Sequence, residues 1–152
     1  MKKHLVKLCK LAVEIELEDQ TGDNAEEYET FDLQRRTVND VVLKKVDEIP
    51  PNEWCHDLKT IPDIDTADVF VWLLGTGWNQ DRLKCYKYDN GYKLFTNNHI
   101  DKVCIHHIPN TDCIYIKCQT TPQTRQNAAP YQTWILVGTD GNIHSGGCAC
   151  VA

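Results

Sequence analysis

The hydrophobic pattern of the chain changes about two-thirds of the way along its length. In the first part, apolar residues recur at helical spacing in separate stretches, as Leu5, Leu8 and Ala12 do among lysines. Asp65 is placed to cap one such stretch, and Gly75 is placed to stop it. The helices and helical turns predicted from this spacing cover residues 5–13, 32–46, 65–75, 80–85 and 91–95.

After Asn98 the pattern becomes that of strands. Four β-branched, aromatic and cysteine-rich runs, separated by turn residues, cover residues 99–108, 113–118, 133–137 and 142–150. We predict an antiparallel meander of three or four strands, with the preceding helices packed on one face of the sheet. The predicted fold class is therefore α+β, with N-terminal helices followed by a small antiparallel β-meander that ends in a Cys-x-Cys hairpin.

Prolines suggest how the chain is divided. Pro50, Pro51 and Pro62 fall in residues 49–64, which we interpret as an extended linker. The linker separates an N-terminal helical region, residues 1–48, from an α+β domain, residues 65–152. The N-terminal region includes an acidic stretch, residues 14–32, that contains Asp and Glu but no Lys or Arg.

Composition limits the class of protein. The chain has 152 residues, 41% hydrophobic and 25% charged, which is typical of a soluble globular protein. Its net charge of −6 argues against a basic surface, although residues 82–125 carry more basic than acidic side chains. No apolar run is long enough to span a membrane, and the N-terminus lacks the features of a signal peptide. We therefore expect an intracellular, nuclear protein with no membrane partner, whose 8 cysteines are reduced and mostly buried.

The final hairpin carries the strongest candidate for chemistry. Cys148 and Cys150 are two residues apart on a predicted strand, so both side chains lie on one face and both thiolates can bind one metal ion. A structural zinc site takes four ligands, and this pair supplies two of them. We predict a zinc half-site at Cys148 and Cys150, with partial and weak binding by this chain. The alternative is two ordinary cysteines near the end of the chain.

Several short motifs follow one another in an order that resembles a known family. They are Leu5-Val6-Lys7-Leu8-Cys9, Trp54-Cys55-His56-Asp57-Leu58, Asp68-Val69-Phe70-Val71-Trp72, Tyr86-Lys87, Tyr92-Lys93-Leu94-Phe95, Pro130-Tyr131-Gln132-Thr133-Trp134, Asp140-Gly141-Asn142-Ile143 and Cys148-Ala149-Cys150. In this order the chain resembles the segment that leads into the SWIM zinc finger of animal proteins with a YqaJ-type viral-recombinase domain, which is similar to phage exonucleases. The resemblance covers most of the chain, and Cys55 stands where those proteins have Ser.

The resemblance implies a finger of the pattern Cys-x-Cys, spacer, Cys-x-His, of which Cys148 and Cys150 match the first half. The Cys-x-His half and the recombinase domain would lie beyond Ala152, so the resemblance implies a fragment of a recombinase-related, mobile-element protein. SWIM modules are proposed to bind DNA or protein. The resemblance places no catalytic residue in this chain, although the full-length parent would be a nuclease.

Other candidate residues have a structural interpretation beside the functional one. Aromatic residues interleaved with basic ones on a sheet can stack bases, and the same residues can form a core. The set is Tyr92, Tyr115, Lys117, Arg125, Tyr131 and Trp134. His106 and His107 are adjacent on a strand and therefore point to opposite faces. The even spacing of His144 from Cys148 predicts that both lie on one face. There His144 is a third ligand, a hydrogen-bond donor to one of the ligands or, the favoured interpretation, a histidine on the surface of the strand.

No stretch of the sequence contains an activated nucleophile, a nucleotide-binding glycine loop or paired metal carboxylates, so we predict that this chain is not an enzyme. The leading hypothesis is a zinc-binding interaction module that binds DNA or protein. One alternative is a structural or protein-interaction domain without nucleic-acid contact. Another is the non-catalytic part of a nuclease whose catalytic domain lies beyond this chain. The sequence indicates neither the partner nor the oligomeric state.

Overall fold

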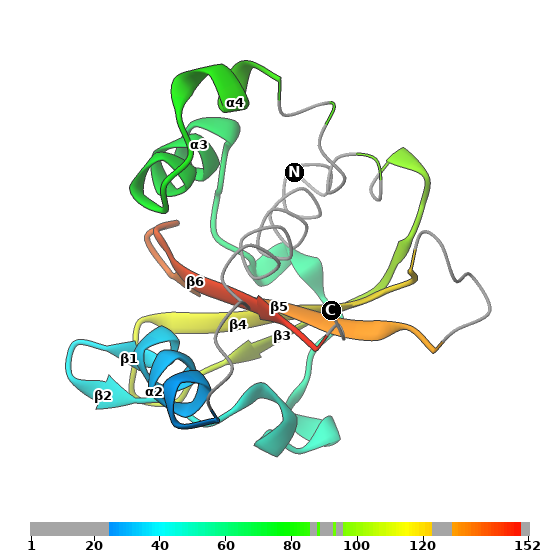
Figure 1. The fold of residues 1–152 in the computed structure, drawn as a ribbon. Coiled ribbons are helices and arrows are strands. Elements are labelled where there is room, and N and C mark those ends of the chain that lie inside the picture. The colour runs from blue at the N-terminus through cyan, green and yellow to red at the C-terminus, as the bar shows by residue number, and fades with distance from the viewer. Residues whose placement is uncertain (1–24, 86–87, 89–92, 94–95, 123–128, 150–152) are drawn as a thin grey trace.

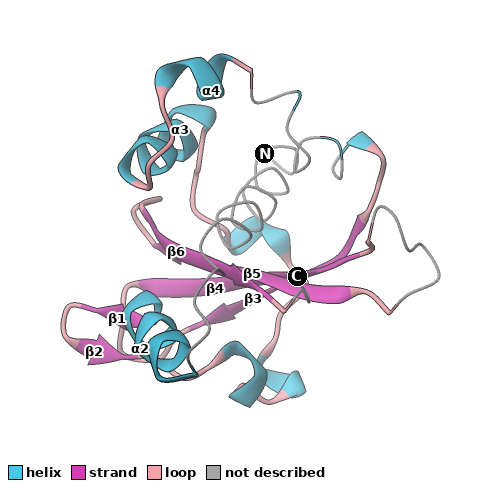
Figure 2. Ribbon diagram, viewed as in Figure 1, coloured by secondary structure: helices cyan, strands magenta, loops and turns pink. Residues whose placement is uncertain are grey.

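The computed structural model describes residues 25–149, apart from 86–87, 89–92, 94–95 and 123–128 (Figure 1). The first predicted helix and most of the predicted turn at 91–95 therefore lie outside the described residues. The fold is α+β, as predicted, and its centre is a four-stranded antiparallel sheet (Figure 2). Within the described part of the chain, no helix is long and apolar enough to cross a membrane.

The strands of the sheet lie side by side in the order of the sequence. They are β3 (Ile100–His107), β4 (Cys113–Thr120), β5 (Tyr131–Gly138) and β6 (Ile143–Cys148). Each pair of neighbours is antiparallel, because each connection returns the chain beside the strand it has just left. The predicted meander is confirmed, with strand bounds that lie within two residues of the predicted ones.

Two helices cover one face of the sheet, α3 (Thr66–Gly75) and α4 (Gln80–Lys84) (Figure 1). Asp65 caps α3, as its position in the sequence predicts, and accepts hydrogen bonds from the backbone N–H groups of Ala67 at 2.6 Å and Asp68 at 3.1 Å. The buried residues of this face include Ile64, Val69, Leu73, Trp78 and Leu83 above the sheet, and Ile105, Ile114, Ile116, Ile135 and Val137 on the strands.

A second layer covers the opposite face, so that the sheet is enclosed on both sides (Figure 1). It consists of α2 (Ala25–Arg35), the hairpin of β1 (Thr37–Val38) and β2 (Val41–Val42), and two 3-10 helices, η1 (Val46–Glu48) and η2 (Pro51–Glu53). The prediction that all the helices pack on one face is therefore wrong. Successive residues of β4 and β5 are buried on both faces, and each apolar face of a sheet needs a cover.

The predicted helix over residues 32–46 is also wrong. Helix α2 ends at Arg35, and the chain continues into the β1–β2 hairpin. The turn residues Asn39 and Asp40 have φ angles of 49° and 63°, which two-residue hairpin turns require and which Asn and Asp tolerate. The valines of this segment fall at helical spacing, but β-branched residues also favour strands, and the Asn-Asp turn decides between the two.

Residues 49–64, predicted to be an extended linker, are packed against the sheet. They contain η2 and one further 3-10 helix, η3 (Leu58–Thr60). Trp54 is buried on the face covered by the hairpin, Ile64 is buried on the face covered by α3, and Cys55 forms an antiparallel bridge with Ile105 of β3. The segment thus passes around the β3 edge of the sheet and contributes to both cores.

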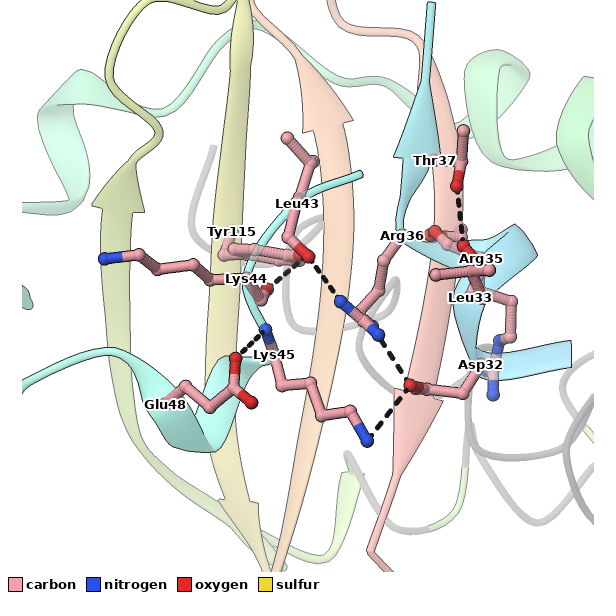
Figure 3. Close-up of polar contacts among 11 residues, drawn as sticks. Asp32, Leu33, Arg35, Arg36, Thr37, Leu43, Lys44, Lys45, Glu48 and Tyr115 are labelled. Atoms are coloured by element: carbon pink, nitrogen blue, oxygen red, sulfur yellow. Dashed lines mark hydrogen bonds and ion pairs between the residues drawn. The ribbon is translucent and has the colours of Figure 1, made fainter. Parts of the chain in front are cut away.

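A buried arginine holds the second layer together (Figure 3). The Arg36 side chain donates from Nε to the Asp32 carboxylate at 3.0 Å and from Nη1 to the carbonyl oxygen of Leu43. Lys45 Nζ lies 3.6 Å from the same carboxylate. Because Asp32 belongs to α2 whereas Leu43 and Lys45 follow the hairpin, these contacts fix the helix against the segment that leads to η1.

Two further hydrogen bonds tie this layer to the sheet. The Tyr115 hydroxyl of β4 donates to the carbonyl oxygen of Lys44 at 3.1 Å (Figure 3). The Ser145 hydroxyl of β6 donates to the carbonyl oxygen of Arg35 at 2.5 Å. The position of the hairpin over the sheet is therefore set by side chains from two different strands.

We expect the substitution Asp32→Asn to lower the free energy of unfolding by about 2 kcal/mol, because it leaves the buried Arg36 guanidinium without its carboxylate. The matched control is Asp81→Asn, which removes an exposed carboxylate that lies 3.1 Å from Lys84 Nζ. The control should change the free energy of unfolding by less than about 0.5 kcal/mol. Urea unfolding followed by tryptophan fluorescence measures both variants, and equal effects would contradict the role given to the buried pair.

Candidate functional site

Three turns meet at one end of the sheet. The β1–β2 turn contains Asn39 and Asp40, the β3–β4 turn contains Asn110, and the β5–β6 turn contains Gly141. All four residues have positive φ angles, between 49° and 91°, which Asn, Asp and Gly adopt more readily than other residues. The Thr139 N–H donates to the Asp112 carbonyl at 2.8 Å and joins the last two turns.

A groove with a volume of about 420 Å³ lies between these turns, and we call it the turn groove. It is lined by Val38, Asn39, Val41, residues 110–113, Gly138, Thr139, Asp140 and His144. The lining combines apolar side chains, amides and hydroxyls with the carboxylates of Asp112 and Asp140, and the described lining residues include no Lys or Arg. Its size is in the range of pockets that bind small ligands or side chains.

Gly138 lets a carboxylate and an imidazole approach the backbone of β5 from the same side. A Cβ atom on Gly138 would press against Asp140 Oδ1 and would lie 3.2 Å from His144 Nε2. Asp140 also accepts hydrogen bonds from the backbone N–H of Asn142 at 3.0 Å and from its side-chain amide at 2.5 Å. These two hydrogen bonds are the main cause that lowers the pKa of Asp140, and the nearby charge of His144 adds a smaller effect in the same direction. The carboxylate is therefore ionised at neutral pH.

Cys113 forms part of the floor of the turn groove and is 5% exposed. Burial, and then the charges of Asp112 and Asp140, raise the pKa of its thiol. Both carboxylates thus act on the same buried sulfur, which places negative potential at the floor of the groove. A thiol with a raised pKa is a poor nucleophile, so this cysteine is not arranged for covalent catalysis.

Cys148, one of the two predicted zinc ligands, ends β6. It is 7% exposed and disulfide-bonded, whereas the other described cysteines form no disulfide bond. These are Cys55, Cys85, Cys104, Cys113 and Cys118. The expectation that every cysteine is reduced is therefore wrong for Cys148, because it was drawn from the N-terminal sequence, which says nothing about which sulfurs the fold brings together. The second predicted ligand, Cys150, lies outside the described residues.

The described residues do not make up a zinc site. Among them, no three His, Cys, Asp or Glu side chains lie where they could hold a metal ion together. Zinc binds the thiolate form of cysteine, and the Cys148 sulfur is held in a disulfide instead. The zinc half-site at Cys148 and Cys150 stays a prediction.

His144 and Cys148 lie on opposite faces of the sheet, contrary to the prediction from their even spacing. The register of β6 shifts at His144, because Leu136 pairs with Ser145 while Val137 pairs with Ile143. Side-chain alternation does not hold across such a bulge. His144 consequently reaches the turn groove, whereas Cys148 lies opposite Thr133, whose hydroxyl contacts Cys118 in the core beneath α3.

His106 and His107 lie on opposite faces, as predicted. His106 is 7% exposed, its ring centroid lies 5.6 Å from that of Trp54, and its Nδ1 lies 3.2 Å from the carbonyl oxygen of Glu53. His107 is exposed at the end of β3. His106 is therefore part of the packing under η2.

The aromatic residues proposed to stack nucleic-acid bases are largely internal. Tyr115 is 1% exposed, and burial raises its pKa to about 12. Trp134 meets Tyr115 edge-on, with 5.6 Å between the ring centroids, and the Arg35 guanidinium lies 5.5 Å from the Trp134 ring. The indole lies so close over Gly147 that a Cβ there would come within 2.7 Å of it. Tyr115 therefore belongs to the core and Trp134 packs against it, as the structural interpretation of the set expects.

Two further members of that set, Lys117 and Tyr131, are partly buried. Lys117 Nζ lies 3.6 Å from the centroid of the Trp54 ring, and burial lowers the pKa of its ammonium group. Tyr131 is half-buried, and burial raises the pKa of its phenol. Tyr92 and Arg125 lie outside the described residues.

Sequence reasoning did not identify the turn groove. The turn residues themselves were visible, because Asn39-Asp40, Asn110 and Gly141 are typical of tight turns. Which turns come together was not visible, because one of the three belongs to a hairpin whose valines have helical spacing.

No family model, curated protein or solved structure matches this chain. The resemblance to the segment before a SWIM zinc finger therefore rests on the sequence motifs and stays a prediction.

Proposed function

We propose that this chain is a non-catalytic protein-interaction module that binds a partner protein at the turn groove. The observation that carries the proposal is the exposed apolar surface beside the groove. Val41 and Val42 are 52% and 53% exposed, and Val41 also lines the groove together with two carboxylates. Apolar side chains that remain exposed beside a polar rim are typical of surfaces that bind other proteins.

Nucleic acid is a less well supported partner. Base stacking needs accessible aromatic faces, whereas Tyr115 is buried and Trp134 is partly buried and packed edge-on against it. Affinity for phosphates comes mainly from Lys and Arg, whereas the charged side chains of the groove are the carboxylates of Asp112 and Asp140. The net charge of −6 acts in the same direction.

We expect no salt-dependent binding of this chain to DNA. Fluorescence anisotropy with labelled single- and double-stranded 20-mers, at low and at physiological salt, measures it. Micromolar binding that weakens steeply as salt rises would contradict the proposal, because counterion release is the signature of phosphate contacts. A Lys117→Gln variant identifies the source of any such binding, since Lys117 is the described basic member of the predicted nucleic-acid surface.

Zinc binding by Cys148 and Cys150 is a second proposal. It is supported by the position of Cys148 at the end of the edge strand β6, where the ladder continues through the Ala149 N–H to the Gln132 carbonyl at 2.8 Å. Two cysteines separated by one residue on an extended strand share a face. Because Cys148 is disulfide-bonded, the proposal requires reduction before zinc can bind.

We expect weak, substoichiometric zinc binding by the reduced chain and none by the oxidised chain. Competition with a zinc-sensitive dye measures it in both states. Cys148→Ser should abolish the binding, and Cys85→Ser, which changes an exposed free cysteine, should leave it unchanged. Zinc held equally well by Cys148→Ser, or no zinc bound by the reduced chain, would rule out this pair as ligands.

A further inference from the structure

We infer that the occupant of the turn groove is a peptide segment that presents an arginine or lysine side chain next to an apolar residue. This inference rests on the proposed function and names the chemistry of the partner. It follows from the charges in the groove, from the apolar surface at its rim, and from the way the two adjoin.

The charges of the groove favour a cation. Asp112 and Asp140 both line it, and both act on the buried thiol of Cys113, so their fields overlap at its floor. Two hydrogen bonds from Asn142 fix the Asp140 carboxylate in place. The described lining residues include no Lys or Arg, so a basic side chain from a partner would balance the two negative charges.

The rim of the groove favours an apolar neighbour to that cation. Val38 and Val41 line the hairpin side of the groove, and Val42 follows Val41 on the same short strand. About half the surface of Val41 and of Val42 is exposed, at 52% and 53%. Covering such surface with an apolar side chain is favourable by about 25 cal/mol for each Å² removed from water.

The arrangement of these groups favours a peptide over a free amine or an inorganic cation. No three acidic, histidine or cysteine side chains of the described chain are placed to hold a metal ion, so an organic cation is the better-supported occupant. A guanidinium group suits this placement well, because its planar donors can meet more than one oxygen. A small amine would leave the valines exposed, whereas a peptide reaches both the carboxylates and the rim.

Selection of a random peptide library displayed on phage against the immobilised chain tests the inference. The expected result is enrichment of peptides with Arg or Lys beside an apolar residue. The most enriched peptide is then synthesised with a fluorescent label, and its binding to variants is measured by fluorescence polarisation. Asp112→Asn should weaken binding about fivefold, as expected for the loss of one partly exposed ion pair. Val41→Lys, which places a like charge at the rim, should weaken binding more strongly.

Matched controls make the same two kinds of substitution at positions away from the groove. Asp81→Asn removes a carboxylate that is 91% exposed on α4, and Val71→Lys changes a valine that is 70% exposed on α3. Both should bind the selected peptide within twofold of the unaltered chain. Circular dichroism of each variant shows whether the fold is kept, and the exposure of the four side chains makes that the expected result.

The outcomes separate the inference from the proposed function. Enriched peptides that lack a basic residue but lose affinity with Val41→Lys would overturn the inference and leave the proposed function standing. Peptides whose binding neither Asp112→Asn nor Val41→Lys affects would bind outside the turn groove and contradict both. No enrichment above an unrelated immobilised protein would contradict the proposed function and the inference together.

Discussion

The structure depends on one constraint, which is that the central sheet has two apolar faces and both must be covered. The middle strands β4 and β5 are buried along most of their length, with side chains such as Ile116 and Ile135 on one face and Tyr115 and Leu136 on the other. The chain provides the first cover with α3 and α4. It provides the second with α2, the β1–β2 hairpin and the segment through η2, and the Arg36 contacts hold α2 against the residues that follow the hairpin.

This constraint also determines where function can lie. Once both faces are covered, aromatic side chains of the sheet are used for packing, as the edge-on contact between the buried Tyr115 and the partly buried Trp134 shows. The edges and ends of the sheet remain available. At one end, the β1–β2 hairpin reaches the turns of the two sheet hairpins, and the turn groove forms between them. The same hairpin therefore completes a core and builds one side of the candidate site.

The four strands and the start of α3 could be predicted because local signals dominate there. β-branched and aromatic runs bounded by turn residues, and Asp65 placed to cap a helix, need no knowledge of the rest of the chain. The hairpin was missed because its three valines fit a helix as well as a strand. The packing of residues 49–64 was missed because prolines predict extended chain without indicating what Trp54 and Ile64 bury against.

The candidate site was harder to predict than the fold, because its parts come from three separate turns. The face of His144 depends on a bulge in β6, which the sequence does not mark. The proximity of Asp112 and Asp140 depends on the pairing of β4 with β5, since residues 113 and 138 are partners in that register. The Cys148–Cys150 spacing, by contrast, was plain in the sequence, whereas the disulfide of Cys148 was not.

The measurement that tests the central claim most directly is chemical-shift mapping by NMR. The ¹⁵N-labelled chain is titrated with the peptide acetyl-Leu-Arg-Leu-amide and with the same peptide carrying citrulline, a neutral relative of arginine. The account predicts that the arginine peptide shifts amide signals in residues 38–41, 110–113 and 138–144, and that the citrulline peptide shifts them much less. Equal shifts with both peptides, or shifts centred on α3 instead of the turn groove, would contradict it.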